Sequence, residues 1–176
     1  MSGAEFLDAV VGLGANLGDP VGAFIAAVGR LQQHGRVVGL STLYRSRPVG
    51  PVQPDFHNAA VRLEMPGDPL ALLDLLLELE REQGRERHER WGPRTLDLDV
   101  LWLGDRVVDS HRLTVPHPRL HERAFALMPL LSLVPTARDP RTGQAYLTTL
   151  SSLGTVGLEV LGDPRWEALR AALTGR

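Results

Sequence analysis

Residues 90–102 read RWGPRTLDLDVLW, in which a Gly-Pro turn leads into a predicted strand that carries two carboxylates. Side chains two residues apart on a strand point to the same face, so Asp97 and Asp99 are expected to lie together. Leu96 and Leu98 then face the opposite side. Two adjacent carboxylates repel each other unless a cation lies between them. The segment therefore predicts a divalent-metal site, and it favours Mg²⁺, which binds one or two carboxylates together with substrate phosphates.

Arginines accompany these carboxylates. Arg90 and Arg94 flank the turn and supply positive charge where a phosphate would lie. An Asp-x-Asp pair at a strand end is often only a solvated turn that binds no metal. Taken without its neighbours, this pair allows that alternative. Its combination with two arginines and a tryptophan on one short segment favours metal-dependent nucleotide chemistry.

The elements that surround this strand predict the fold. Asp19-Pro20 and Asp68-Pro69 are helix-start signals, and each is followed by leucines, valines or phenylalanine at helical spacing. The second of these helices is expected to end at Gly84 with Glu78 and Glu80 on its polar side. Strands are predicted at residues 7–13, 36–44, 58–65 and 96–103. The order βαββαβ is typical of a ferredoxin-like α+β sandwich, an antiparallel sheet with helices on one face.

The C-terminal part is expected to add two helices to this sandwich. The first is predicted at residues 124–133. The second follows Asp163-Pro164 and would direct Trp166 inward.

Composition excludes several classes of protein. A chain of 176 residues with 43% hydrophobic residues is expected to form one domain, residues 1–176. It has no cysteine, no apolar run long enough to span a membrane and no signal peptide, so we expect a cytoplasmic enzyme. A monomer is a separate expectation. The net charge of −2 argues against a general nucleic-acid binder. All 19 basic residues are arginines, which excludes the lysine of a Walker A loop.

Two connections, residues 45–57 and 85–95, are longer than ordinary turns, and their prolines, arginines and tryptophan point to ligand binding. Two other motifs suggest competing ligands. Gly12-x-Gly14 invites a dinucleotide-binding interpretation, but the spacing to Gly18 is wrong, and these glycines are expected to serve a tight strand-to-helix turn. His117 and His121 are four residues apart, but prolines bracket His117, which argues against a zinc-binding helix face.

Four segments in order resemble the 6-hydroxymethyl-7,8-dihydropterin pyrophosphokinase family. They are GLGANLGD at residues 12–19, YRSRPVGPVQPDFHNAAV at 44–61, RWGPRTLDLD at 90–99 and LTVPHPRLHERAF at 113–125. The resemblance runs from about Val10 to Pro135. It implies the same ferredoxin-like fold and the transfer of pyrophosphate from ATP to the hydroxymethyl group of 6-hydroxymethyl-7,8-dihydropterin.

The resemblance also implies roles for individual residues. Asp97 and Asp99 would hold two Mg²⁺ ions, and Arg85 and Arg94 would be catalytic and bind ATP. The remaining ATP-binding residues would be Val100, Arg112, Thr114, His117 and Arg123. The pterin would be bound by Ser46, Val49, Phe56, Asn58, Trp91 and Phe125.

The residues also allow two alternative functions. A ferredoxin-like fold also hosts RNA-binding modules, but these need exposed aromatic residues on the central strands, and Val10-Val11 and residues 61–63 provide none. A magnesium-dependent nucleotide phosphohydrolase would use the same carboxylates with water as the acceptor.

Overall fold

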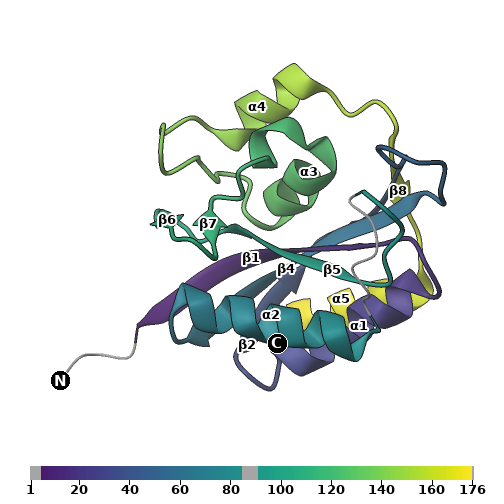
Figure 1. The fold of residues 1–176 in the computed structure, drawn as a ribbon, viewed down its shortest axis with the longest axis horizontal. Coiled ribbons are helices and arrows are strands. Elements are labelled where there is room, and N and C mark those ends of the chain that lie inside the picture. The colour runs from purple at the N-terminus through teal and green to yellow at the C-terminus, as the bar shows by residue number, and fades with distance from the viewer. Residues whose placement is uncertain (1–4, 85–90, 176) are drawn as a thin grey trace.

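The computed structural model describes residues 5–84 and 91–175 (Figure 1). Arg85, predicted to be catalytic, lies outside these residues. None of the helices in the described part of the chain is long and apolar enough to cross a membrane. In chain order the elements are β1 (Phe6–Ala15), α1 (Pro20–Leu31), β2 (Arg36–Leu40), β3 (Leu43–Ser46), β4 (Phe56–Pro66), α2 (Pro69–Glu82), β5 (Asp97–Trp102), β6 (Val108–Asp109), β7 (Thr114–Val115), η1 (Leu120–Glu122), α3 (Ala124–Leu133), α4 (Tyr146–Leu153), β8 (Leu158–Leu161) and α5 (Pro164–Thr174).

The main sheet confirms the ferredoxin-like prediction. Its strands lie in the order β5-β1-β4-β3-β8, with β2 also paired to β4, and every pairing is antiparallel. β1 and β4 are therefore central, and β5 forms an edge. Both helix-start signals work as expected, because the side chains of Asp19 and Asp68 accept hydrogen bonds from the N–H groups of Gly22 and Ala71.

The predicted second strand, residues 36–44, is divided into β2 and β3. Ser41 lies between them, and its Oγ accepts a 2.8 Å hydrogen bond from the N–H of Ala60. The carbonyl of Ser41 accepts a 2.9 Å bond from the indole of Trp166 in α5. The strand therefore bends where a helix from the end of the chain anchors it. Strand β8, helix α4 and the β6–β7 hairpin were not predicted from the sequence.

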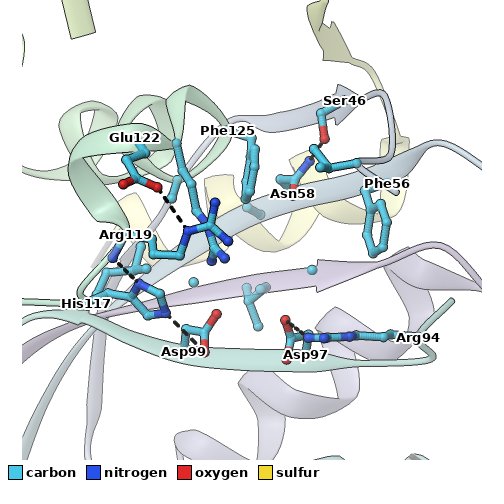
Figure 2. A pocket seen from close by; sticks show the side chains of 18 of the residues that line it. Ser46, Phe56, Asn58, Arg94, Asp97, Asp99, His117, Arg119, Glu122 and Phe125 are labelled. Atoms are coloured by element: carbon cyan, nitrogen blue, oxygen red, sulfur yellow. Dashed lines mark hydrogen bonds and ion pairs between the residues drawn. The ribbon is translucent and has the colours of Figure 1, made fainter. Parts of the chain in front are cut away.

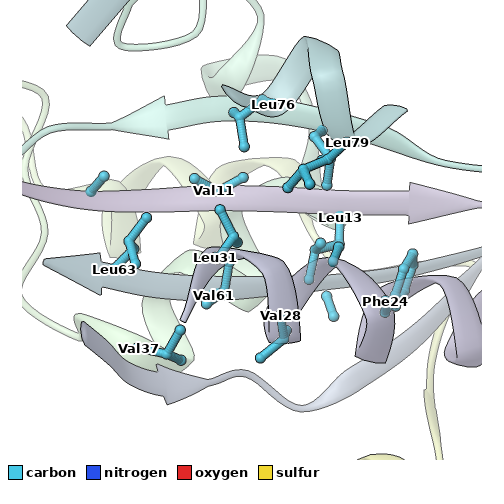
Figure 3. Packing of buried hydrophobic residues seen from close by; sticks show 14 of the residues in the cluster. Val11, Leu13, Phe24, Val28, Leu31, Val37, Val61, Leu63, Leu76 and Leu79 are labelled. Carbon is cyan, nitrogen blue, oxygen red and sulfur yellow. The ribbon is translucent and has the colours of Figure 1, made fainter. Parts of the chain in front are cut away.

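The two faces of the sheet bury different clusters of apolar side chains, and Figure 3 shows residues of the first cluster. Alternate residues of β1, from Leu7 to Ala15, pack with α1, α2 and the buried Trp166 of α5. On the opposite face, Val10, Ala60 and Leu101 pack against residues of α3 and α4. The prediction of helices on one face thus holds for α1 and α2, whereas α3 and α4 cover part of the other face. The remainder of that second face is hollow and forms the pocket described below.

The prediction that Glu80 lies on the polar side of its helix is wrong. Its side chain is buried, and Oε1 accepts a 2.8 Å hydrogen bond from the N–H of Leu98 in β5. The edge position of β5 explains this, because a backbone N–H that points away from the sheet needs another acceptor. The carboxylate of Glu80 thereby fixes β5 to α2 at the residue between Asp97 and Asp99.

Glu80→Ala should leave the buried N–H of Leu98 unpaired and lower the free energy of unfolding by about 1–3 kcal/mol. Urea denaturation followed by circular dichroism measures this loss. Glu78→Ala on the same helix is the matched control, because the side chain of Glu78 is 58% exposed and its removal should change stability by no more than about 0.5 kcal/mol. Equal losses for the two variants would contradict the anchoring role.

Candidate active site

A pocket of about 210 Å³ opens on the second face of the sheet, where β1, β4 and β5 lie side by side (Figure 2). Its floor is formed by Gly12 and Gly14 of β1. Gly14 lies opposite Asn58 of β4 on one side and Asp97 of β5 on the other. A Cβ atom at Gly14 would be 3.9 Å from the Cβ of Asp97 and 4.0 Å from Oδ1 of Asn58. The missing side chains therefore keep the space between the carboxylates and the amide open.

These two glycines do not serve the turn that the sequence predicted for them, because both lie inside the extended strand β1. The turn glycine is Gly18, whose φ of 66° lies in the left-handed region. Period-2 alternation places Gly12 and Gly14 on the pocket face, as it places the core residues of the same strand on the other.

The two carboxylates share one face, as their spacing predicted. Asp97 and Asp99 both line the pocket, while Leu96 and Leu98 are buried in the core on the opposite side. Nη1 of Arg94 donates to Oδ2 of Asp97 at 2.6 Å. A guanidinium thus already lies against the first carboxylate.

Electrostatics at the second carboxylate favour a bound cation. Burial and the neighbouring Asp97 raise the pKa of Asp99 to about 7, although Arg123 opposes the shift. The side chain of Asp99 is 38% exposed toward the pocket, so a ligand can reach it. Two carboxylates held together in a partly desolvated site fit a divalent cation, which would relieve their repulsion.

The carboxylates do not form a complete metal cage. Within residues 5–84 and 91–175, no group of three or more His, Cys, Asp or Glu side chains converges to hold a metal ion. A cation here would take further ligands from water or from a bound substrate, which is the usual arrangement for Mg²⁺ in nucleotide sites. His121 is exposed and lies 3.5 Å from Glu122, so the described residues do not support the zinc interpretation either.

His117 is a neutral donor at physiological pH. Burial, followed by the charge of Arg123, lowers its pKa to about 4. Its Nδ1 accepts a 3.1 Å hydrogen bond from the backbone N–H of Arg119. The proton of the neutral ring is therefore assigned to Nε2, which lies 4.0 Å from Oδ1 of Asp99. His117 thus presents an N–H group to the space above the carboxylates.

A wall of charged and aromatic side chains stands opposite the carboxylates (Figure 2). Arg123 is half-buried, which lowers its pKa, and its guanidinium lies 5.7 Å from the ring centre of Phe125. Arg119 and Glu122 also line this wall, joined by a 3.0 Å hydrogen bond. Sequence reasoning missed both residues, as well as Arg47 at the pocket rim. No periodic signal marks them, because Arg119 and Glu122 lie at the short helix η1 and Arg47 lies in the long connection after β3.

At the other end of the pocket, a buried amide lies between aromatic rings. Nδ2 of Asn58 donates a 2.7 Å hydrogen bond to Oγ of Ser46, and both side chains are buried. The pairing of β3 with β4 places Ser46 beside Phe56. Figure 2 shows Phe56 and Phe125 flanking Asn58. This arrangement suits a flat ligand that both stacks and forms hydrogen bonds.

The described parts of the two long loops, residues 45–57 and 91–95, meet at the end of β1. Oδ1 of Asn16 accepts a 2.8 Å hydrogen bond from the N–H of Arg94, and its Nδ2 donates to Oε1 of Gln53 at 3.0 Å. Nε2 of Gln53 in turn donates to the carbonyl of Trp91 at 2.8 Å. This junction brings the described parts of both loops to one pocket, and their role in ligand binding stays a prediction.

Eleven of the predicted site residues line the pocket: Ser46, Val49, Phe56, Asn58, Trp91, Arg94, Asp97, Asp99, His117, Arg123 and Phe125. Three others do not line it. Val100 directs its side chain into the core, Thr114 belongs to the β6–β7 hairpin, and Arg112 forms an ion pair with Asp74 of α2.

Comparison with known proteins identifies relatives that match the part of the chain that forms the pocket. A family model described as 7,8-dihydro-6-hydroxymethylpterin-pyrophosphokinase matches residues 10–135. Proteins named 2-amino-4-hydroxy-6-hydroxymethyldihydropteridine pyrophosphokinase are similar in Synechocystis sp., with 42% identity over 82% of this chain and 75% of the relative, and in Pseudomonas aeruginosa, with 48% identity over 74% and 82%.

The fold is similar to a solved wild-type Plasmodium falciparum HPPK-DHPS structure, with a TM-score of 0.67. The identity is 13%, and the alignment covers 86% of this chain but only 45% of that one. At this identity the likeness concerns the fold alone.

Asp99→Asn should stabilise the metal-free protein above neutral pH. The raised pKa means that ionising Asp99 costs folding free energy, and this cost appears as pH rises from about 4 through about 7. At about pH 8 the variant should gain roughly 1 kcal/mol, a value kept small because solvent screens a side chain this exposed, and its Tm should rise by about 2–4 °C. At about pH 4 the two proteins should unfold at similar temperatures.

Thermal unfolding with and without Mg²⁺ checks this prediction, and the metal should stabilise the wild type more than the variant. Asp105→Asn, at an exposed turn, is the control and should show neither effect. A Tm difference that is the same at both pH values would contradict the assignment.

Proposed function

This chain belongs to the 7,8-dihydro-6-hydroxymethylpterin-pyrophosphokinase family, and from this membership we infer its reaction. It is an ATP-dependent diphosphotransferase of folate biosynthesis. It transfers pyrophosphate from ATP to the hydroxymethyl group of 6-hydroxymethyl-7,8-dihydropterin, giving AMP and the pterin diphosphate. The observation that carries this function is a single pocket in which Gly12 and Gly14 separate two carboxylates from a buried amide flanked by aromatic rings.

We propose that the amide end binds the pterin. The Nδ2 group of Asn58 is oriented by Ser46, and the asparagine side chain can both donate to and accept from the edge of a fused ring. Phe56 and Phe125 would stack on the faces of the ring, with Trp91 and Val49 completing the pocket. The pocket volume of about 210 Å³ suits one flat ring system, so the nucleotide would extend beyond it.

The carboxylate end is proposed to bind the triphosphate through Mg²⁺. Two bound ions, held by Asp97 and Asp99, would neutralise phosphate charge and orient the chain of phosphates for attack at the β-phosphorus. Arg94 and Arg123 approach this region from opposite sides, and His117 directs its Nε2–H toward it. These three side chains would bind phosphate oxygens by charge and hydrogen bonding.

The three predicted ATP-binding residues that do not line the pocket would contact the nucleotide outside it. Val100 and Thr114 would contact the adenine region, and for Val100 this leaves the main chain, because its side chain is in the core. Arg112 would reach the nucleotide by leaving Asp74. The catalytic role of Arg85 stays a prediction, as do the monomeric state, the cytoplasmic location and the absence of a nucleic-acid partner.

Catalysis in this pocket would depend on positioning rather than on a general base. Both nitrogens of His117 are unsuited to take a proton, because Nδ1 accepts from the backbone and Nε2 carries the hydrogen. Transfer of phosphoryl-type groups requires little covalent help from the protein, and alignment with charge neutralisation supplies most of the acceleration.

The test is a reaction of the purified protein with ATP, Mg²⁺ and 6-hydroxymethyl-7,8-dihydropterin, analysed by anion-exchange chromatography. AMP and pterin diphosphate should appear in equal amounts, and only when the pterin is present. Phosphate release without pterin would indicate the phosphohydrolase alternative. Salt-sensitive retention on an RNA column, without protection by an MgATP analogue against thermal unfolding, would indicate the RNA-binding alternative.

Asn58→Ala should weaken pterin binding much more than ATP binding. The variant leaves a hydrogen-bonding edge of the ligand unpaired in a buried site, which costs about 1–3 kcal/mol. Isothermal titration with each ligand separates the two affinities. Ser46→Ala is the companion variant, and it should produce a smaller loss in the same direction because it removes only the group that orients Asn58. Equal losses for pterin and ATP would assign Asn58 a general structural role.

A further inference from the structure

Arg119 lines the pocket and contacts Trp91, but it has no role in the function proposed above. Its guanidinium carbon lies 4.8 Å from the centre of the Trp91 ring, and both residues line the pocket. Nε of Arg119 donates to Oε2 of Glu122 at 3.0 Å. A guanidinium over an indole face is attracted by the negative charge density of the ring. The contact thus connects the turn at η1 to Trp91, which is predicted to bind the pterin.

The ion pair with Glu122 does not by itself account for this geometry. Both side chains are close to half exposed, at 44% and 49%, and pairs of this kind contribute little to stability. Leu120 between them is buried and fixes the turn that carries both residues. The hydrogen bond with Glu122 therefore holds the guanidinium of Arg119 at its position over the Trp91 ring.

Trp91 needs such support. Its φ of 68° lies in the left-handed region, which is unfavourable for a bulky side chain and persists only where surrounding contacts maintain it. The hydrogen bond from Gln53 holds the main chain of Trp91. The contact with Arg119 acts on the ring. Among the described residues, Gln53 thus supports the main chain of Trp91 and Arg119 supports its ring, from separate parts of the chain.

We propose that Arg119, oriented by Glu122, is a positioning residue that sets the Trp91 ring for pterin binding. The proposal rests on the function inferred above. Because Arg119 acts through Trp91, its loss should affect the pterin and leave the nucleotide site unchanged. A direct phosphate contact by Arg119, beside His117 and Arg123, is the competing role and predicts the opposite.

The first test is spectroscopic and independent of activity. The protein is labelled with 5-fluorotryptophan, and the Trp91 resonance is assigned from its loss in Trp91→Phe, which leaves those of Trp102 and Trp166. Arg119→Met should shift the Trp91 resonance alone, Glu122→Gln should shift it less, and Arg119→Lys should restore part of the wild-type position. Arg106→Ala, which removes an ion pair with Glu5 outside the pocket, should leave all three unchanged. An unchanged Trp91 resonance in Arg119→Met would overturn the proposal.

The second test is kinetic. Arg119→Met should raise the KM for the pterin by roughly threefold to thirtyfold, the range expected for a cation–π contact, with the KM for MgATP unchanged. In Trp91→Phe/Arg119→Met the two effects should not add, because they share one contact. A rise in the KM for MgATP, or full additivity, would overturn the proposal. If the wild type forms no AMP, the proposed function fails, whereas the fluorine result still decides whether Arg119 positions Trp91.

Discussion

The pairing of edge strand β5 with central strand β1 is the constraint on which the site depends. It sets Asp97 opposite Gly14 and Asp99 opposite Gly12, while the pairing of β1 with β4 sets Asn58 on the other side of Gly14. The two carboxylates and the amide are therefore separated by the width of one strand, which has glycine at both positions between them. A shift of β5 by one residue would turn both carboxylates into the core.

The same geometry places stability and function in opposition. The carboxylates repel each other in a partly desolvated site, and this repulsion appears as the raised pKa of Asp99. The protein counters it with Arg94, paired to Asp97, and with Arg123 on the opposite wall. These cations are also the groups that would meet a triphosphate. The charge that stabilises the free protein is therefore the charge that would bind the substrate.

Relatives at 42% and 48% identity and a solved fold at 13% identity differ in what they show. The first establish the family and hence the reaction, while the last establishes only that the same arrangement of sheet and helices recurs. The roles of the individual residues therefore have to be argued from the pocket. Beside the pocket, Asn16 connects the described parts of the two long loops, so that pocket residues from distant parts of the chain are held at one end of β1.

The sequence by itself determined what local rules control. Period-2 alternation placed Asp97 and Asp99 on one face, cap signals marked the starts of α1 and α2, and the segments that resemble the family contained most of the pocket residues. Only the tertiary structure decided the burial of Glu80, the bend at Ser41 and the contact of Arg119 with Trp91. Each depends on a partner at least 18 residues away in the chain. Dihedral preferences and periodicity act over a few residues, so such contacts exist only after the elements have packed.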